Sequence, residues 1–220
     1  WYQGEGNVTN PKPYKDFTHD LVNSWRAQWD DEKLPFYFVQ ITPYAYNKHR
    51  NRKVLNADLL REAQVKATQE IPNTGIVITN DVGNCNNIHP AEKEIIAERL
   101  TNYALSLHYK MKGLAYKSPE YQSMKIDGDK IILSFNFFSK NKKDKGFKTD
   151  IEIKDFMIAE EDQQFYPAQI TVNKNNTITV FSEMVKNPVA VRYGFDDCLK
   201  GSLFSKNGLP ISVFRTDNWE

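Results

Sequence analysis

The sequence predicts an α/β fold with a parallel sheet, followed by a β-rich antiparallel region. Between residues 14 and 109, three helix-like segments alternate with two short apolar segments, the order typical of a layered α/β fold. Beyond Gly113, short runs of β-type residues are separated by turn residues instead. These two patterns place a domain boundary near residue 113, so that residues 1–112 and 113–220 form two domains without a long linker.

The first helix is predicted over residues 14–29. Apolar side chains recur there every four residues and define one face, which we expect to be buried: Phe17, Leu21, Trp25 and Trp29. The apolar run FYFVQIT follows Pro35 and has the length and composition of a buried parallel strand.

A second helix is predicted over residues 56–69, with Asn56 as a possible N-cap, and TGIVITND forms the second strand. The third helix is predicted over residues 90–109, and Pro90 suits its first turn because the missing N–H would be unpaired there. Its expected core face carries Ile96, Leu100, Tyr103 and Leu107.

The second half of the chain reads as antiparallel β structure. KIILSFNFF follows an Asp-Gly-Asp turn, ITVNKNNTITVF contains Asn175 and Asn176 between two alternating arms, and VAVRYGF follows Pro188. The lysine-rich run SKNKKDKGFK marks an exposed loop.

Composition limits the class of partner. The chain of 220 residues carries 29 Lys and Arg against 28 Asp and Glu, a net charge of +1, so it has no general attraction to nucleic acid or to an anionic membrane. No apolar run approaches the ~20 residues that span a bilayer. Cys85 and Cys198 leave the redox compartment open, and no Cys/His spacing resembles a metal site.

Chemically useful residues gather at two places, the opening WYQGEGN and the stretch NDVGNCNNIHP at residues 80–90. The second stretch follows a predicted strand, where sites form in parallel α/β sheets. His89 directly precedes Pro90 and is therefore the expected N-cap of the third helix, where the dipole favours a neutral imidazole suited to general-base catalysis. Asp81 and Glu5 are the candidate acids that would orient it.

Simpler interpretations stay open for these residues. His89 could serve only as a cap, and Gly4-Glu5-Gly6 could be a plain tight turn. We expect His19 to be solvated, and we assign no function to His108, which suits the last turn of a helix. The basic run NKHRNRK at residues 47–53 is either a solvated surface or an anion-binding loop.

Several motifs, in order along nearly the whole chain, resemble those of one known family: WYQGEGN, SWRAQW, LPFYFVQITPY, LLREAQ, NTGIVITNDVGN, IHPAEKEIIAERL, VAVRYGF and NGLPISVFRTD. As a set they are similar to the sialic-acid and carbohydrate O-acetylesterases, a branch of the SGNH hydrolases. The resemblance implies a flavodoxin-like three-layer sheet, of which residues 1–112 would form the C-terminal half, and a β-rich, sandwich-like accessory domain over residues 113–220.

The resemblance also implies roles for individual residues. His89 of IHP matches the catalytic histidine, and QGEGN supplies Gln3 and Gly4 near the oxyanion hole with Glu5 as the acid. Asn7 would contact substrate or hold the turn, and Gln64 of REAQ matches a position near the pocket. The superfamily often places Asp three residues before the histidine, but Asn86 stands there, so the acid is Glu5 or Asp81, with Glu5 preferred.

This chemistry needs a serine nucleophile, which in the family precedes the QGE block. Ser24 and Ser106 fall within predicted helices, and the other serines lie mostly in the β half. We therefore expect this sequence to be the C-terminal portion of a longer protein, to depend on an N-terminal part that carries the serine, and to be inactive alone.

The activity implied is removal of O-acetyl groups from a sugar, with sialic acid the leading substrate and no metal or organic cofactor required. If the substrate is a sialic acid, His49, Arg50 or Arg52 could bind its carboxylate. The alternatives are deacetylation of xylan or another polysaccharide, or a non-catalytic carbohydrate-binding role. The family favours a secreted or periplasmic location, which the residues themselves do not establish.

Overall fold

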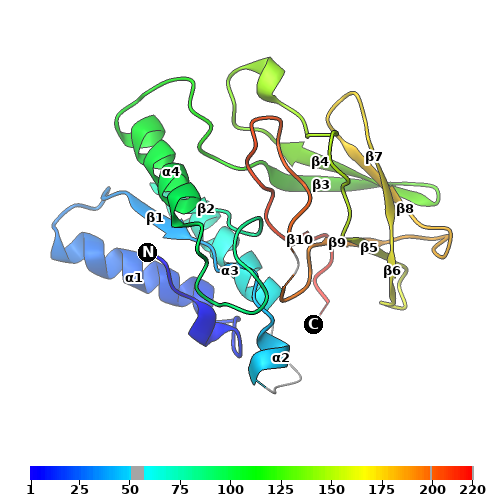
Figure 1. The fold of residues 1–220 in the computed structure, drawn as a ribbon, viewed down its shortest axis with the longest axis horizontal. Coiled ribbons are helices and arrows are strands. Elements are labelled where there is room, and N and C mark those ends of the chain that lie inside the picture. The colour runs from blue at the N-terminus through cyan, green and yellow to red at the C-terminus, as the bar shows by residue number, and fades with distance from the viewer. Residues whose placement is uncertain (51–56, 199, 220) are drawn as a thin grey trace. The chain divides into compact units, whose positions relative to one another are not determined.

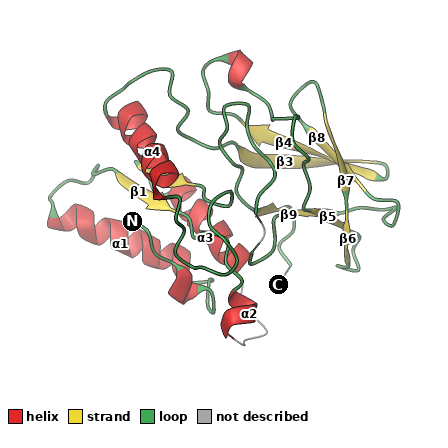
Figure 2. Cartoon of the chain, in the orientation of Figure 1, coloured by secondary structure: helices red, strands yellow, loops and turns green. Residues whose placement is uncertain are grey.

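The computed structural model describes residues 1–50, 57–198 and 200–219. The chain forms two compact units, which are described separately (Figures 1 and 2). Unit 1 comprises Trp1–Lys117 and Asp196–Lys200, and unit 2 comprises Ser118–Phe195 and Gly201–Glu220. The protein is thus a mixed α/β structure with antiparallel sheets in its second half.

Unit 1 is built on a short parallel sheet. Strand β1 (Phe36–Val39) pairs in parallel with β2 (Thr74–Val77), as the two apolar runs predict. Tyr2 forms an isolated parallel bridge with Val39 on the other side of β1. The opening segment, β1 and β2 therefore run in the same direction, and the loops that follow them emerge at one edge of the sheet.

Helices pack against both faces of this sheet. One apolar cluster joins β1 and β2 to α1 (Tyr14–Gln28) and α3 (Ala57–Glu70) through Val22, Phe38, Ala67 and Ile76. A second cluster joins the opposite face to α4 (Lys93–Tyr103) through Val39, Val77, Ile96 and Tyr103. The short helix α2 (Tyr46–Arg50) follows β1, and the predicted N-cap Asn56 lies outside the described residues.

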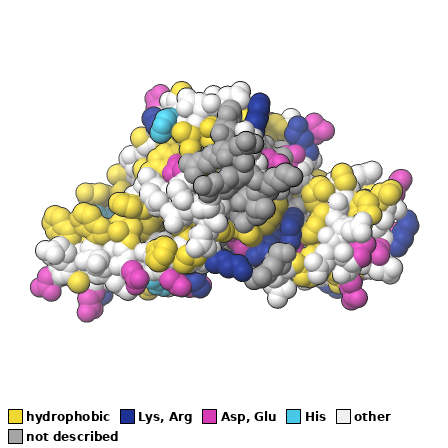
Figure 3. Space-filling model, turned by 90° about the horizontal axis from the view of Figure 1, so that it is seen from below, with side chains coloured by type: hydrophobic (Ala, Val, Ile, Leu, Met, Phe, Trp, Pro, Cys, Tyr) yellow, Lys and Arg dark blue, Asp and Glu magenta, His cyan; other side chains and the backbone are white. Residues whose placement is uncertain are grey.

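Most of the face of α1 that we expected to be buried is exposed; Leu21 is the exception, partly buried against the cluster of Val22 and Phe38. Phe17, Trp25 and Trp29 are 56%, 43% and 64% exposed. Hydrophobic side chains gather on the surface at the left of Figure 3. The buried side chains of α1 are Tyr14, Thr18, Val22 and Arg26.

Hydrogen bonding explains why the polar face of α1 is buried. The Tyr14 hydroxyl donates to the Gln3 carbonyl at 2.7 Å. The Arg26 guanidinium donates to the carbonyls of Leu34 and Pro72 at 3.1 and 2.6 Å. Buried polar groups are tolerated when they are paired, and hydrophobic periodicity carries no information about such distant acceptors.

The third helix begins later than predicted. It starts at Lys93 with Glu92 at the N-cap position, so His89 is not the cap and Pro90 is not in the first turn. Asn side chains hold the preceding loop in turns, since Asn84 Oδ1 accepts from the Asn86 N–H and Asn87 Oδ1 from the His89 N–H. Such local bonds compete with helix formation, and the dipole argument for a neutral His89 does not apply.

Helix α4 ends in a π-helical turn, η2 (Ala104–His108), which places Ser106 and His108 in one helical segment with it. The ring of Tyr103 packs on the face of the sheet directly over Gly75. A Cβ added to Gly75 would approach this ring to 2.5 Å. This contact explains why a glycine stands in the middle of β2.

Unit 2 contains two four-stranded sheets. The first has the order β3 (Glu120–Asp127), β4 (Lys130–Asn136), β8 (Ile178–Phe181) and β7 (Gln169–Val172). The second has the order β10 (Phe214–Arg215), β9 (Ala190–Tyr193), β5 (Phe156–Ala159) and β6 (Phe165–Pro167). All the pairings in these sheets are antiparallel, as the turn signals predict.

One apolar cluster drawn from both sheets fills unit 2 and includes Phe135, Phe156, Tyr193 and Phe214. Burial raises the pKa of Tyr193 to about 12, and its hydroxyl accepts from the N–H groups of Ser202 and Leu203. The motifs VAVRYGF and NGLPISVFRTD meet through a bidentate ion pair of Arg192 with Asp217, at 2.8 and 2.9 Å.

The buried face of α1 gives a direct stability prediction. Val22→Ala should lower the free energy of unfolding by about 2 kcal/mol, because Val22 is fully buried and the change leaves a cavity. Trp29→Gln should change it by less than about 0.5 kcal/mol, since most of that side chain is in water. Urea unfolding of both variants measures this difference, and a larger loss from Trp29→Gln would mean that the aromatic face is the packed one.

Candidate active site

The opening QGEG stretch forms a tight turn at the edge of the sheet where the strands end. Glu5–Asn7 is a 3-10 turn (η1), and the Asn7 N–H donates to the Gly4 carbonyl at 2.7 Å. Gly4 has a φ of +156°, and a Cβ there would lie 2.8 Å from Ile41 Cγ2 and 3.0 Å from Gln64 Nε2. Only glycine permits this close approach of the turn to the segment that follows β1 and to α3.

Gln64 ties the turn to the end of β1. Its side chain is buried, its amide nitrogen donates to the Gln3 carbonyl at 3.1 Å, and its oxygen accepts from the Ile41 N–H at 3.1 Å. The Gln3 side chain in turn donates to Asn7 Oδ1 at 2.9 Å. Gln64 therefore holds two backbone segments at a fixed separation, and Asn7 holds the side chain of Gln3.

Glu5 lies beside this network. It is half-buried, and its negative charge adds to the effect of burial in raising the pKa of Tyr2 and of Tyr14. Burial is the larger cause in both cases. The carboxylate thus sits near two tyrosines of the opening segment and of α1.

The loop of His89 is anchored at several points. The Ala45 N–H donates to the Cys85 carbonyl at 3.1 Å, and the Gly83 N–H donates to the Glu92 carboxylate at 3.3 Å. Hydrogen bonds from its own backbone N–H and then from that of Gly83 lower the pKa of Glu92. Ile88 packs against the apolar cluster of Val8, Tyr14, Ile41 and Tyr46, so the residue before His89 contacts the region that follows the QGE turn.

Asp81 is committed to an ion pair. Its two oxygens accept from Arg99 at 2.8 and 2.6 Å, and Arg99 also donates to the Ile78 carbonyl at 2.8 Å. Both side chains are largely buried. This bidentate pair links the end of β2 to α4. The Asp81 carboxylate therefore has a structural role as the partner of Arg99.

His89 is exposed, in a loop at the same edge of the sheet as the QGE turn. Among the residues that the structure describes, neither Glu5 nor Asp81 forms a hydrogen bond with its imidazole. Catalytic hydrogen bonds in ligand-free proteins are often long and tighten only when substrate binds.

Sequence reasoning missed the role of Arg61. Its guanidinium is 1% exposed and donates to the carbonyls of Ile41, Thr42, Asp196 and Asp197. Burial lowers its pKa, while the charges of Tyr46, Asp58, Asp197 and Asp196 act in the opposite direction. Arginine stays protonated in proteins, so this is a buried cation satisfied by carbonyl oxygens.

The segment 196–200 belongs to unit 1 although it follows β9 of unit 2. Asp197 accepts from the backbone and side-chain amides of Asn47, and Cys198 forms a disulfide with Cys85. Burial raises the pKa of Asp197. The disulfide fixes this segment to the loop that carries His89, four residues after Cys85. Two cysteines far apart in sequence gave no signal for this pairing.

The other residues considered in the sequence lie outside this network or outside the described residues. The side chains of His49 and Arg50, and all of Arg52, lie outside the described residues. The serines of unit 1, Ser24 and Ser106, lie in α1 and η2. His19, on the surface of α1, has its Nε2 3.5 Å from a carboxylate oxygen of Glu70 in α3, so its side chain is not entirely solvated.

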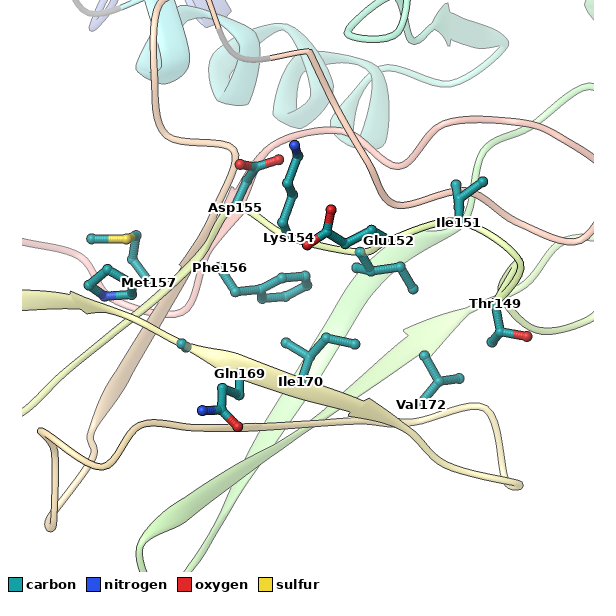
Figure 4. A pocket seen from close by; sticks show the side chains of 13 residues that line it. Thr149, Ile151, Glu152, Lys154, Asp155, Phe156, Met157, Gln169, Ile170 and Val172 are labelled. Atoms are coloured by element: carbon teal, nitrogen blue, oxygen red, sulfur yellow. The ribbon is translucent and has the colours of Figure 1, made fainter.

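A pocket of about 750 Å³ lies within unit 2, between the segment that precedes β5 and the strand β7 (Figure 4). Phe156, Ile170 and Val172 supply apolar side chains, and Glu152 and Lys154 supply charged ones. It contains none of the predicted site residues, which all lie in unit 1.

In the described part of the chain, no group of three or more His, Cys, Asp or Glu side chains could hold a metal ion. Within residues 1–50, 57–198 and 200–219, no helix has the length and apolar character needed to cross a membrane.

Comparison with known proteins shows which family the chain is similar to. Residues 1–102, which include the QGE turn and the His89 loop, match the family described as carbohydrate esterase, sialic acid-specific acetylesterase. The resemblance indicated by the motifs is confirmed, and the chain is similar to carbohydrate acetylesterases.

Individual relatives agree with this class. The chain is 23% identical over 210 residues to sialate O-acetylesterase from Pongo abelii, covering 89% of this chain and 40% of that protein. It is 25% identical over 154 residues to the Mus musculus enzyme of the same name, covering 62% and 28%. It aligns over its whole length with 49% of a crystal structure of a carbohydrate acetylesterase from Xanthomonas citri, with a TM-score of 0.87 and 33% identity. The chain spans less than half the length of each of these relatives.

Removal of the Gln64 amide should loosen the QGE turn. Gln64→Leu leaves the Ile41 N–H without its partner and removes one of the two hydrogen bonds to the Gln3 carbonyl, which still accepts from Tyr14, so the free energy of unfolding should fall by about 2 kcal/mol. Gln28→Leu, at an exposed position of α1, is the matched control and should be nearly neutral. Equal effects in urea unfolding would contradict the bridging role.

The disulfide gives a second prediction. Replacing Cys85 and Cys198 together by Ser should lower the free energy of unfolding by about 2–4 kcal/mol. Amide hydrogen exchange should accelerate in residues 84–89, because the segment 196–200 no longer restrains them. Unchanged exchange in that loop would contradict the proposed anchoring.

Proposed function

We propose that this polypeptide contributes the histidine and the oxyanion-side residues of a carbohydrate O-acetylesterase. The observation that carries the proposal is the placement of the QGE turn and the His89 loop at one edge of the sheet, both packed against the cluster of Val8 and Ile41. The family match over residues 1–102 and the carbohydrate acetylesterase relatives support the same activity.

The mechanism would be acyl transfer to a serine supplied by sequence that precedes Trp1. His89 removes the proton from the serine hydroxyl as it attacks the acetyl carbonyl, and the same imidazole then protonates the departing sugar oxygen. Water hydrolyses the acyl-enzyme with His89 again as base, which releases acetate. The rigid turn at Gly4, with the amide of Gln3, would stabilise the oxyanion, a contribution typically worth ~3–4 kcal/mol per donor.

Glu5 is the favoured acid partner of His89. The ion pair of Asp81 with Arg99 already uses both Asp81 oxygens, so reorienting that carboxylate toward a histidine would leave Arg99 unpaired. Among the described residues, Glu5 forms no such ion pair, and it lies in the turn that Gln64 holds in place.

The fold proposed for the intact enzyme is the flavodoxin-like SGNH layer structure, of which unit 1 would be the C-terminal half. Helices on both faces of a parallel sheet support this assignment. We propose residues 113–220 as the β-rich accessory domain, apart from the return segment 196–200.

Sialic acid is the proposed source of the acetyl ester, because the family match and the curated relatives carry that name. Acetylated xylan is the competing substrate, since the Xanthomonas citri neighbour is described only as a carbohydrate acetylesterase. Comparing acetate release from O-acetyl sialic acid and from acetylated xylooligosaccharides separates the two.

The role of each carboxylate can be tested in a longer polypeptide that includes the preceding sequence. His89→Ala should lower kcat by roughly three orders of magnitude or more, and Glu5→Gln by roughly two, because both act in proton transfer. Asp81→Asn should mainly lower the free energy of unfolding, by roughly 2 kcal/mol, because it breaks the pair with Arg99. Normal hydrolysis of a chromogenic acetate ester after His89→Ala would end the esterase proposal.

The 220-residue chain alone should not release acetate from either substrate, because the proposed nucleophile lies outside it. Turnover by the purified chain, lost on replacement of Ser24 or Ser106, would place the nucleophile within these residues and refute this part of the mechanism.

A further inference from the structure

A lysine-rich turn of unit 2 is unexplained by the proposed esterase chemistry. Residues 139–148 read SKNKKDKGFK, and the turn contains the short 3-10 helix η3 (Lys142–Asp144). The whole chain has a net charge of only +1, so this concentration of positive charge leaves the remainder net acidic. The charge is therefore segregated on the surface rather than dispersed.

Two further lysine-bearing segments converge on this turn at Gly146. The Lys206 N–H donates to the Gly146 carbonyl at 3.0 Å, and the Lys148 N–H donates to the Phe204 carbonyl at 2.9 Å. A Cβ on Gly146 would lie 2.6 Å from Asn176 Oδ1 and 3.1 Å from Lys206 Cε. The missing side chain thus lets the Lys206 hairpin and the turn at residues 173–177, which carries Lys174, approach the first turn closely.

The positive charges of this surface are not neutralised by partners. Lys140, Lys142, Lys143 and Lys206 are exposed, and within the part of the chain that the structure describes no ion pair involves them. Asp144, the acid within the turn, accepts hydrogen bonds from Ser139 and Asn141 instead. Clustered charges of one sign raise the local concentration of counter-ions and steer them to the surface.

The side chains around the lysines indicate the kind of anion. Asn141, Asn175 and Asn207 are exposed on the converging segments; their oxygens accept local hydrogen bonds, and their NH₂ groups can still donate to hydroxyl groups. Phe147 is buried, Phe137 and Phe138 are partly buried, and among the described residues of unit 2 no aromatic side chain is exposed. Base stacking needs an exposed ring, so this surface favours an anionic glycan over a single-stranded nucleic acid.

We propose that the converging turns of Lys140–Lys148, Lys174 and Lys206 bind a carboxylate-bearing polysaccharide. The ammonium groups attract the repeated carboxylates and the asparagines contact the sugar hydroxyls. Such a surface holds the protein on an acidic glycan independently of the residues that would cleave acetyl esters, so binding needs no turnover.

Affinity electrophoresis of the purified chain tests this, with gels that contain a linear polymer of sialic acid, neutral dextran or inorganic polyphosphate. We expect retardation by the sialic acid polymer, none by dextran, and a loss of retardation with added salt. The triple variant Lys142→Glu, Lys143→Glu and Lys206→Glu should weaken the affinity by about tenfold or more, equivalent to about 1.4 kcal/mol.

The matched control changes the same charge at exposed lysines elsewhere: Lys33→Glu, Lys112→Glu and Lys186→Glu. It should bind the sialic acid polymer nearly as the unmodified chain does. Equal weakening in both triple variants would show a net-charge effect and overturn the site. Retardation by polyphosphate equal to or greater than that by the glycan would overturn the assignment of ligand. If charge reversal unfolds the chain, as circular dichroism would reveal, the corresponding Lys→Gln triple serves with the same expected loss.

Discussion

Two buried polar side chains of α3, Arg61 and Gln64, determine how the loops of unit 1 are held. They lie three residues apart, so they project from neighbouring positions on one side of the helix. Gln64 spans the Gln3 carbonyl and the Ile41 N–H, and Arg61 donates to carbonyls of residues 41 and 42 and of residues 196 and 197. A hydrophobic residue at either position would leave buried backbone groups without partners.

This arrangement joins three segments that are far apart in sequence. The QGE turn depends on Gln64, the end of β1 depends on both side chains, and the segment 196–200 depends on Arg61 and on the disulfide to Cys85. The second half of the chain thus contributes residues to unit 1, where they restrain the loop of His89. The proposed base is held by distant residues as well as by its own strand and helix, as expected of a site that must keep its geometry.

Much of the local structure could be predicted from the sequence, because it depends on local patterns. The apolar runs gave the parallel strands β1 and β2, and Asn175-Asn176 marked the hairpin of β7 and β8. The motifs also led to the carbohydrate acetylesterase relatives.

Periodicity failed for α1, where Tyr14 and Arg26 are buried by hydrogen bonds to distant carbonyls while Trp25 and Trp29 remain exposed. It also failed at the start of α4, where Asn84 and Asn87 hold local turns. The pairing of Cys85 with Cys198 and the role of Arg61 depend on contacts across more than a hundred residues, which spacing does not encode.

The central claim is that the QGE turn and His89 act on one acyl group. A crystal structure of a longer polypeptide that includes the sequence before Trp1, inactivated by an alkyl phosphonate ester whose serine adduct mimics the tetrahedral intermediate, tests it most directly. The account predicts a serine-bound phosphorus, with one oxygen within hydrogen-bond reach of the His89 imidazole and another facing the backbone of Gly4. An adduct bound away from both residues, or on a side chain of unit 2, would contradict it.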